Sequence, residues 1–288
     1  MKIDDIKHGY VLIIPVLIVV CLLVYVAKYE RLPFTSSTGV EELDEVKSEE
    51  TLNLISRSIA QKDAKTFSAL CQYPIIRPYP LKDIEDAGQM QDYFDIIFDD
   101  STCNSFKDVS ADDWEEVGYR GYCLNQGQLW VSDKLYAINF LSEKEYSILQ
   151  DRIAMDIESL HPALRFENMA PEICFKSAEL NSIFRIDTDL QTDSMRLAAF
   201  PDGDLKGNAS FIAKGIIDIG GSGGITSYDF TLPDGDNYSF TNGTNDGSWK
   251  LVVYPDGEID SLAATETKIS VCYWLDEVEN VPVKRSRQ

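Results

Sequence analysis

The sequence has little histidine and little positive charge. It holds two histidines in 288 residues, and 26 lysines and arginines stand against 48 aspartates and glutamates, a net charge of −22. So few histidines exclude catalysis by several histidine side chains and most histidine-rich metal sites. A chain this acidic repels phosphate backbones, so we predict no nucleic-acid partner.

The sequence also lacks the spacings of common metal and cofactor sites. No two cysteines have CxxC spacing, which argues against a zinc ribbon or a thioredoxin-type site. The glycine-rich segment 220–224 is not followed by GK[ST], so it is not a phosphate loop. The acidic loops at 234–247 lack the glycine and glutamate of an EF-hand. We therefore predict neither a metal nor a cofactor.

A long apolar run is present near the start of the chain. Residues 10–27 (YVLIIPVLIVVCLLVYVA) contain no charge, and a helix of this length covers most of a hydrocarbon core about 30 Å thick. A cleaved signal peptide is less favoured, because Tyr25 stands where a small residue is needed before a cleavage site after Ala27. Lipidation of Cys21 is disfavoured by the valines before it. The run predicts an uncleaved, single-pass signal-anchor through which the protein binds a membrane.

The charge distribution bears on the orientation of this predicted anchor. Basic residues are nearly balanced on its two sides, but the part after Arg31 carries 45 acidic and 22 basic residues, a net charge of −23. Such an acidic body with several cysteines is typical of an exported domain. We therefore expect the protein in the cell (inner) membrane, with the amino terminus inside and the later domains extracytoplasmic (periplasmic).

Five cysteines follow the apolar run, and two disulfides are candidates. Cys174 and Cys272 stand near the two ends of a β-rich region, and Cys103 and Cys123 bracket an acidic loop and a strand. Cys71 would then remain a buried thiol at the end of a helix. The alternative is that all five are reduced core residues.

The hydrophobic periodicity and the positions of turn and linker residues divide the chain into six parts. We expect a cytoplasmic tail, a transmembrane anchor, a linker, an α+β domain, a β-rich domain and a flexible tail, at 1–9, 10–27, 28–50, 51–162, 163–278 and 279–288. Asp63 is a predicted helix N-cap, and Ser142 with Glu145 forms a predicted capping box. Alternating apolar residues such as Tyr228, Phe230 and Leu232 predict strands in the β-rich part.

The order of helices followed by a curved sheet resembles the NTF2-like (SnoaL-like) cone fold. The motifs that carry the resemblance are Ala60-Gln61-Lys62-Asp63-Ala64 with Phe67, Leu70 and Tyr73-Pro74, then Trp114-Glu115-Glu116-Val117-Gly118-Tyr119-Arg120-Gly121 and Gly127-Gln128-Leu129-Trp130. The chain is also similar to a group of bacterial envelope proteins, with the added string Tyr79-Pro80-Leu81 and Leu160-His161-Pro162. The resemblance covers about residues 51–160 and implies a conical pocket without a fixed activity. The expected fold class is thus an N-terminal transmembrane helix, an α+β NTF2-like cone domain and an all-β, sandwich-like or barrel-like, C-terminal domain.

The residues expected at the mouth of this pocket are aromatic, with one arginine. An arginine there could hold a carboxylate or a sugar oxygen while aromatic rings stack on the ligand. The alternative is that these aromatics fill the core. The candidates are Tyr93, Trp114, Tyr119, Arg120 and Trp130.

No set of residues forms a coherent catalytic constellation. His161 precedes a proline at a helix end, a place typical of C-terminal capping or packing rather than of a general base. The sequence therefore favours a membrane-anchored envelope protein that binds a small ligand, a glycan or a protein partner without catalysis. Two alternatives stay open: an NTF2-like hydrolase or isomerase with a pocket carboxylate, and an inhibitor or assembly factor that acts on an envelope enzyme through its β-domain.

Overall fold

The computed structural model describes residues 45–280 apart from 167, 202–204, 206, 221–224, 243–247 and 258–262. The described part divides into two compact units, residues 45–150 and residues 151–280, and the boundary falls within one helix, α6. The predicted tail at 1–9, the predicted anchor at 10–27, Cys21 and most of the linker and of the C-terminal tail lie outside the described residues.

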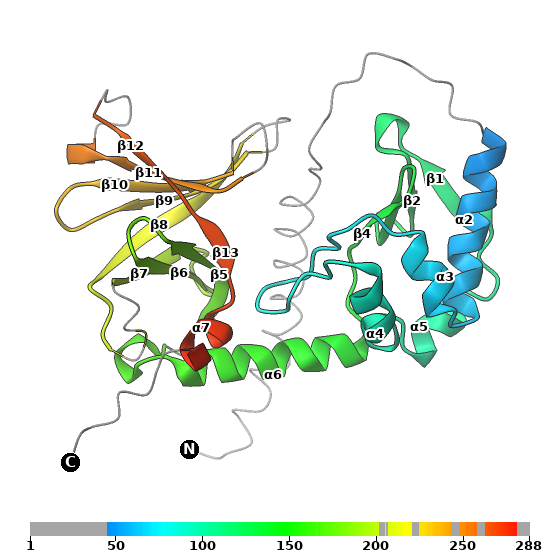
Figure 1. Cartoon of the computed structure of the whole chain (residues 1–288), viewed down its shortest axis with the longest axis horizontal. Helices are drawn as coiled ribbons and strands as arrows, with labels where there is room; N and C mark the ends of the chain where they lie inside the picture. Colours follow the sequence, from blue (N-terminus) through cyan, green and yellow to red (C-terminus); the bar gives the residue numbers. More distant parts are fainter. Residues whose placement is uncertain are drawn as a thin grey trace. The chain divides into compact units, whose positions relative to one another are not determined.

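The first unit packs short helices against one face of a small sheet (Figure 1). The helices are α2 (Glu45–Ala60), α3 (Ala64–Ala69), α4 (Ala87–Ile97) and α5 (Asp100–Ser105), followed after the sheet by α6 (Glu143–Ser159), and the 3-10 turns are η1 (Ala111–Asp113) and η2 (Gly118–Arg120). The antiparallel sheet has the order β1 (Trp114–Glu116), β2 (Tyr122–Leu124), β3 (Leu129–Val131) and β4 (Leu135–Ile138).

Side-chain caps set where several of these helices begin. The Asp63 carboxylate accepts the Thr66 amide at 3.0 Å at the start of α3, which confirms the predicted N-cap. Asp99 caps α5 in the same way. At the start of α6, Ser142 Oγ accepts the Glu145 amide at 3.0 Å, the first half of the predicted capping box. Caps satisfy amides that have no partner within the helix, so each one favours a single start.

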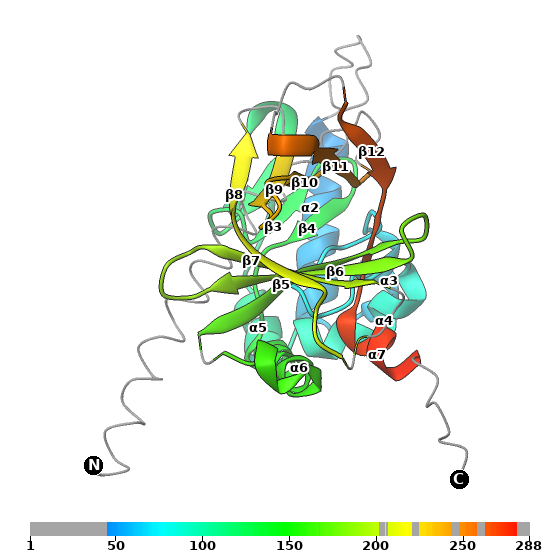
Figure 2. The ribbon, with the colours of Figure 1, turned by 90° about the vertical axis from the view of Figure 1, so that its left-hand side faces the viewer.

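The second unit is an antiparallel meander that nearly closes into a barrel (Figures 1 and 2). Its strands are β5 (Met169–Ser177), β6 (Ser182–Asp189), β7 (Met195–Pro201), β8 (Phe211–Gly220), β9 (Ile225–Thr231), β10 (Asn237–Thr241), β11 (Lys250–Tyr254), β12 (Thr265–Lys268) and β13 (Ser270–Cys272). The 3-10 turns η3 (Pro162–Leu164) and η4 (Pro255–Gly257) and the helix α7 (Trp274–Asn280) complete the unit.

The barrel closes through one short segment of chain. β12 pairs with β11 and β13 pairs with β5, although only Ile269 separates β12 from β13. The two ends of the sheet are therefore joined by consecutive residues, and the ribbon runs on from β12 through β13 to α7 (Figure 1). Closure of this kind leaves few unpaired strand edges.

Apolar side chains, many of them aromatic, occupy the inside of the barrel. The Phe175 and Phe240 rings stack with centroids 5.4 Å apart, and Phe184 packs edge-on against Phe240 at 5.3 Å. Trp249 adds contacts with Phe175 at 4.9 Å and Tyr228 at 6.0 Å. Because strand side chains alternate between faces, the other face of β5–β7 is left for α6 and α7 to cover.

The fold class expected from the sequence is wrong. No helix among the described residues is long and apolar enough to cross a membrane. The described part is dominated by the nearly closed nine-stranded sheet, with few helices beside it. In the first unit the strands have three or four residues, so they build a small meander in place of a large curved sheet. Close turns cause this shortness: η2 separates β1 from β2, and only residues 125–128 separate β2 from β3.

Candidate functional site

The register of the small sheet places its two tryptophans on opposite faces. Trp114 lies opposite Leu124, which lies opposite Leu129, and these side chains face the helices in the core of the first unit. Trp130 lies opposite Cys123 in the neighbouring row, so it faces the other way. The outer face of the sheet therefore carries a large aromatic side chain.

Trp130 is held in place by a hydrogen bond from its ring nitrogen and by a contact with a second aromatic ring. Its Nε1 donates to the carbonyl oxygen of Gly127 at 2.9 Å, and its ring lies 6.4 Å from that of Tyr136 at an angle of 36°. The Tyr136 hydroxyl in turn donates to the Arg120 carbonyl at 3.1 Å. Tyr136 comes to lie there because a bulge shifts the β3–β4 register after Trp130.

Two further side chains of this surface come from η2. Tyr119 is 82% exposed, and the Arg120 guanidinium carbon lies 5.9 Å from the centre of its ring. Gly121 makes this approach of η2 to β3 geometrically feasible, because it has a positive φ of 84° and a Cβ there would lie 2.1 Å from the Val131 carbonyl oxygen. We call Tyr119, Arg120, Trp130 and Tyr136 the aromatic face.

The five predicted pocket residues are thus divided by the fold. Tyr119, Arg120 and Trp130 belong to the aromatic face, whereas Trp114 is a buried core residue whose Nε1 donates to Ser56 Oγ at 3.3 Å. Tyr93 lies on α4 and packs, partly buried, against the core of the first unit. Sequence reasoning missed Tyr136, and the signal that would reveal it, the bulge, is a property of strand pairing.

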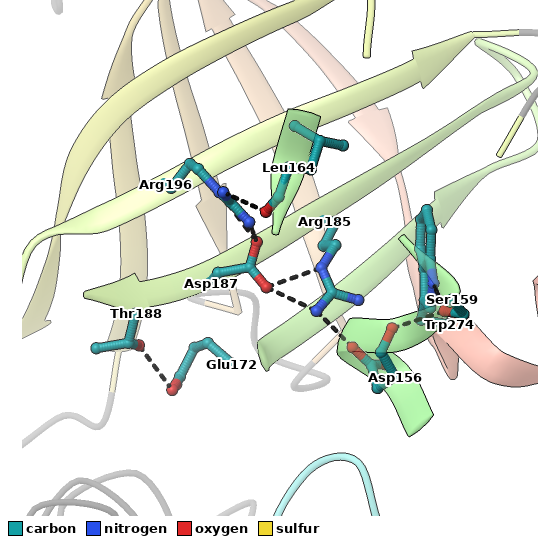
Figure 3. Close-up of polar contacts among 9 residues, drawn as sticks. All are labelled: Asp156, Ser159, Leu164, Glu172, Arg185, Asp187, Thr188, Arg196 and Trp274. Atoms are coloured by element: carbon teal, nitrogen blue, oxygen red, sulfur yellow. Dashed lines mark hydrogen bonds and ion pairs between the residues drawn. The ribbon is translucent and has the colours of Figure 1, made fainter. Parts of the chain in front are cut away.

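A network of buried charges lies on the outer face of β6 and β7 in the second unit (Figure 3). Arg185 Nε donates to Asp187 Oδ1 at 2.7 Å, and Arg185 Nη2 lies 2.5 Å from Asp156 Oδ1 on α6. Arg196 Nη2 lies 2.5 Å from Asp187 Oδ2, and its Nη1 donates to the Leu164 carbonyl at 2.9 Å. All four charged side chains are at most 5% exposed, and two positive charges balance two negative ones.

Aromatic and polar side chains of α6, α7 and the sheet surround this network of buried charges. Trp274 of α7 lies under Arg185, with 5.1 Å from the guanidinium carbon to the ring centre, and its Nε1 donates to Ser159 Oγ on α6 at 2.7 Å (Figure 3). Towards the barrel interior, the Tyr228 hydroxyl donates to Glu172 Oε1 at 2.9 Å. These contacts fix the C-terminal half of α6 and the start of α7 on the sheet, so the network has a structural role.

Asp156 is an acid of this network whose pKa is shifted by its surroundings. Burial raises the pKa of its carboxyl above the usual value, against the opposing effect of the Arg185 guanidinium. An acid whose pKa is higher folded than unfolded binds protons more tightly in the folded state. Its contribution to stability is therefore full below the unfolded pKa and is lost as the pH rises through the folded pKa.

We expect this linkage to appear in a comparison with Asp156→Asn, which cannot titrate. The free energy of unfolding of the wild type, minus that of the variant, should grow as the pH falls from neutral towards about 4, the usual pKa of an aspartate. Denaturant unfolding at a series of pH values measures it. A difference that shrinks on acidification would mean that the attraction of Arg185, and not burial, determines the direction in which the pKa of the Asp156 carboxyl is shifted.

A second buried ion pair lies in the first unit. Arg77 donates from Nε to Glu145 Oε1 at 2.8 Å and from Nη2 to Glu145 Oε2 at 2.5 Å. It also donates to the carbonyl oxygens of Ile138 and Phe140, at 2.7 and 2.9 Å. The Glu145 carboxylate, expected to complete the capping box, is thus bound to a side chain 68 residues away. The pair connects α6 to the loop before α4 and to the end of β4.

The cysteines and His161 also have defined places. The five cysteines of the described residues are buried thiols. Cys103 Sγ donates to the Phe98 carbonyl oxygen at 3.2 Å, and its predicted disulfide with Cys123 stays a prediction. Cys174 and Cys272 lie directly opposite each other in β5 and β13. His161 Nδ1 accepts the Ala163 amide at 3.3 Å, so it caps the start of η3, whereas the sequence predicted a cap at the C-terminal end of a helix.

Metal ligands do not gather in the described ranges. No group of three or more histidine, cysteine, aspartate or glutamate side chains is arranged there to hold an ion. Comparison of the chain with family models, with curated proteins and with solved structures finds no match. The resemblance to the NTF2-like superfamily therefore stays a prediction of the sequence.

Proposed function

We propose that the chain is a non-catalytic binding protein that engages a protein partner through the aromatic face. The observation that carries the proposal is the exposure of Tyr119 beside Arg120, next to the fixed pair of Trp130 and Tyr136. Tryptophan, tyrosine and arginine are the residue types that dominate binding energy at protein–protein interfaces. Large aromatic side chains at a surface, gathered in one place, are typical of an interaction site.

The hydrogen bonds of the aromatic face favour a protein partner over a glycan. The Trp130 indole and the Tyr136 hydroxyl both donate to carbonyl oxygens of their own chain. Their polar atoms are thus engaged, and apolar ring surface is what they offer. The same hydrogen bonds hold the rings before binding, so little side-chain entropy is lost when a partner docks.

The charge of the chain indicates the kind of partner. The net charge is −22, and the exposed Glu115 shares the outer face of the sheet with Trp130. A partner with an apolar patch surrounded by basic residues would complement this surface and be steered towards it. We therefore expect binding to weaken at high salt, because screening reduces the attraction between exposed charges.

The arrangement of the buried charges supports a function without catalysis. Arg77 is bound to Glu145, and Arg185 and Arg196 are bound to Asp156 and Asp187. The NTF2-like hydrolase or isomerase considered above needs a pocket carboxylate with a raised pKa next to Arg120. Among the described residues, the carboxyl with a raised pKa is that of Asp156, which belongs to the other unit.

Membrane anchorage through residues 10–27 and an extracytoplasmic location stay predictions. Fractionation of cells that produce the full chain, followed by protease treatment of the intact and the opened cells, tests both. If residues 28–288 stayed protected from the protease in cells whose outer envelope is opened but whose inner membrane is intact, the predicted orientation would be wrong.

The proposed binding is tested by photo-crosslinking in cells, followed by binding of the purified pair. A photoreactive residue at position 119 should give one main protein adduct, and the same residue at position 54, an exposed place on α2, should not. With the purified partner, we expect Trp130→Ala to weaken binding by at least tenfold, the loss of about 1.4 kcal/mol or more that is typical of a binding hot spot.

Leu54→Ala is the matched control, since Leu54 is an exposed apolar residue of the same unit outside the aromatic face. Equal binding by wild type and Trp130→Ala would contradict the proposal. So would robust turnover of an ester, glycoside or ketosteroid-like substrate that a single aspartate or histidine substitution abolishes.

A further inference from the structure

Two cysteines meet at the seam where the barrel closes. In the antiparallel pairing of β13 with β5, Ser270 lies opposite Lys176, Val271 opposite Phe175 and Cys272 opposite Cys174. Cys174 is fully buried and Cys272 is 8% exposed, and both are thiols in this structure. The Cys272 thiol is among the groups that raise the pKa of the Cys174 thiol, so the two side chains lie close to each other.

The register places the Cα atoms of the two cysteines at a separation that a disulfide allows. Residues directly opposite each other on antiparallel strands have Cα atoms about 4.5 or 5.5 Å apart, according to the kind of pair. Disulfides join residues whose Cα atoms are roughly 4.4–6.8 Å apart. The strand separation is therefore compatible with a bond between the two sulfur atoms.

The other buried cysteines of the described residues do not share this arrangement. Cys71 forms a bridge to Leu135, Cys123 lies opposite Trp130 and Glu115, and Cys103 Sγ donates to the Phe98 carbonyl oxygen. The seam is thus the one place among the described strands where two cysteines face each other across a ladder. A bond at that place would reinforce the closure of the barrel, because β13 has only three residues with which to pair with β5.

We infer that Cys174 and Cys272 form a reversible disulfide that locks the barrel at its seam. In the oxidised form a covalent bond joins β13 to β5, and the chain next to it leads directly to Trp274, which lies under Arg185. In the reduced form the short β13 ladder and the contacts of α7 hold the seam by themselves. The inference is independent of the aromatic face and of the function proposed for it.

The reaction is a thiol–disulfide exchange with a small-molecule disulfide as oxidant. One cysteine thiolate attacks the oxidant, its sulfur–sulfur bond breaks, and a mixed disulfide forms while one small thiol leaves. The second cysteine then attacks the mixed disulfide, and the second small thiol leaves. The protein thus gives up two electrons and two protons, and the oxidant becomes two thiols.

Burial decides which cysteine reacts first and how fast. Cys272 is the more exposed of the two, so we expect the mixed disulfide to form there. Burial raises the pKa of the Cys174 thiol well above its usual value, against the smaller opposing effect of the Arg185 guanidinium. Since the thiolate is the reactive form, exchange should be slow at neutral pH and faster in alkaline solution.

Peptide mapping tests the pairing directly. The full chain is equilibrated with oxidised glutathione or with dithiothreitol, the remaining thiols are alkylated, and the protein is cleaved with trypsin. Cys174 and Cys272 fall in the tryptic peptides 166–176 and 269–284, while Cys71, Cys103 and Cys123 fall in 66–82, 83–107 and 121–134. We expect oxidised protein to contain 166–176 joined to 269–284, and reduced protein to contain both peptides alkylated.

Thermal unfolding gives a second, independent measurement. Because the disulfide closes a long loop, oxidation should raise the unfolding midpoint of the barrel by roughly 10 °C. Cys272→Ala should abolish the joined peptide and the shift, while Cys103→Ala, another buried cysteine, should leave both unchanged. Alkylation of Cys174 and Cys272 after oxidation, or their joining to other cysteines, would overturn the inference. So would a midpoint that oxidation does not raise although the joined peptide forms.

Discussion

Asp187→Asn is expected to lower the free energy of unfolding by about 3–5 kcal/mol, the usual effect of removing one partner from a buried ion pair. Asp187 is 1% exposed and is bound by two arginines, at 2.7 Å to Arg185 and 2.5 Å to Arg196. Asparagine keeps the size of the side chain and removes its charge. The buried network would then hold two positive charges against the single carboxylate of Asp156.

Urea unfolding followed by circular dichroism measures this effect. The matched control is Glu266→Gln, which removes the acid from the ion pair with Lys250 on the surface of the same barrel. Glu266 is 60% exposed, so water already screens its charge and the free energy of unfolding should change little. If Asp187→Asn and Glu266→Gln had equal, small effects, the Arg185 network would not stabilise the barrel as the structure indicates.

Glu145→Leu is expected to destabilise the first unit by about 3–5 kcal/mol for the same physical reason. Glu145 is fully buried and binds Arg77 through two parallel hydrogen bonds, at 2.8 and 2.5 Å. Leucine leaves the guanidinium buried without a counter-charge. A mixture of charge loss and packing change is expected in any single variant, so the pair needs a double-mutant cycle.

Arg77→Met combined with Glu145→Leu completes that cycle. Replacing both charges by apolar side chains removes the unpaired charge, so the double variant should be more stable than Glu145→Leu alone. Recovery should be incomplete, because Arg77 also satisfies the carbonyl oxygens of Ile138 and Phe140. A double variant less stable than both single variants would show that the two side chains do not act as a pair.

Features that depend on residues close in sequence could be predicted from the sequence. The cap at Asp63 and the Ser142 half of the capping box are local hydrogen bonds between residues three apart. The alternation of Tyr228 and Phe230 agrees with β9, in which both are buried in the barrel. Each of these features depends on the period or the chemistry of a few neighbouring residues, so no knowledge of distant contacts is needed.

The buried charges could not be predicted in this way. Arg185 and Asp187 alternate with Phe184 and Ile186 on β6, a pattern that is also typical of a strand with one face in water. Whether that face is solvated or covered depends on α6 and α7, which lie elsewhere in the sequence. The second half of the predicted capping box is a hydrogen bond from the Ser142 amide to the Glu145 carboxylate. It could not be predicted correctly for a similar reason, because Arg77 offers Glu145 a stronger partner than a backbone amide.

The sequence by itself determined the acidity of the chain, its uncharged run at 10–27, several helix starts and the alternating strands, since these depend on composition and on neighbouring residues. Only the tertiary structure decided that β12 and β13 pair with opposite ends of one sheet, and so that Cys174 faces Cys272. It also separated Trp130 from Trp114 by placing them on opposite faces. Strand register joins residues far apart in the chain, and a shift of one residue would move every side chain to the other face.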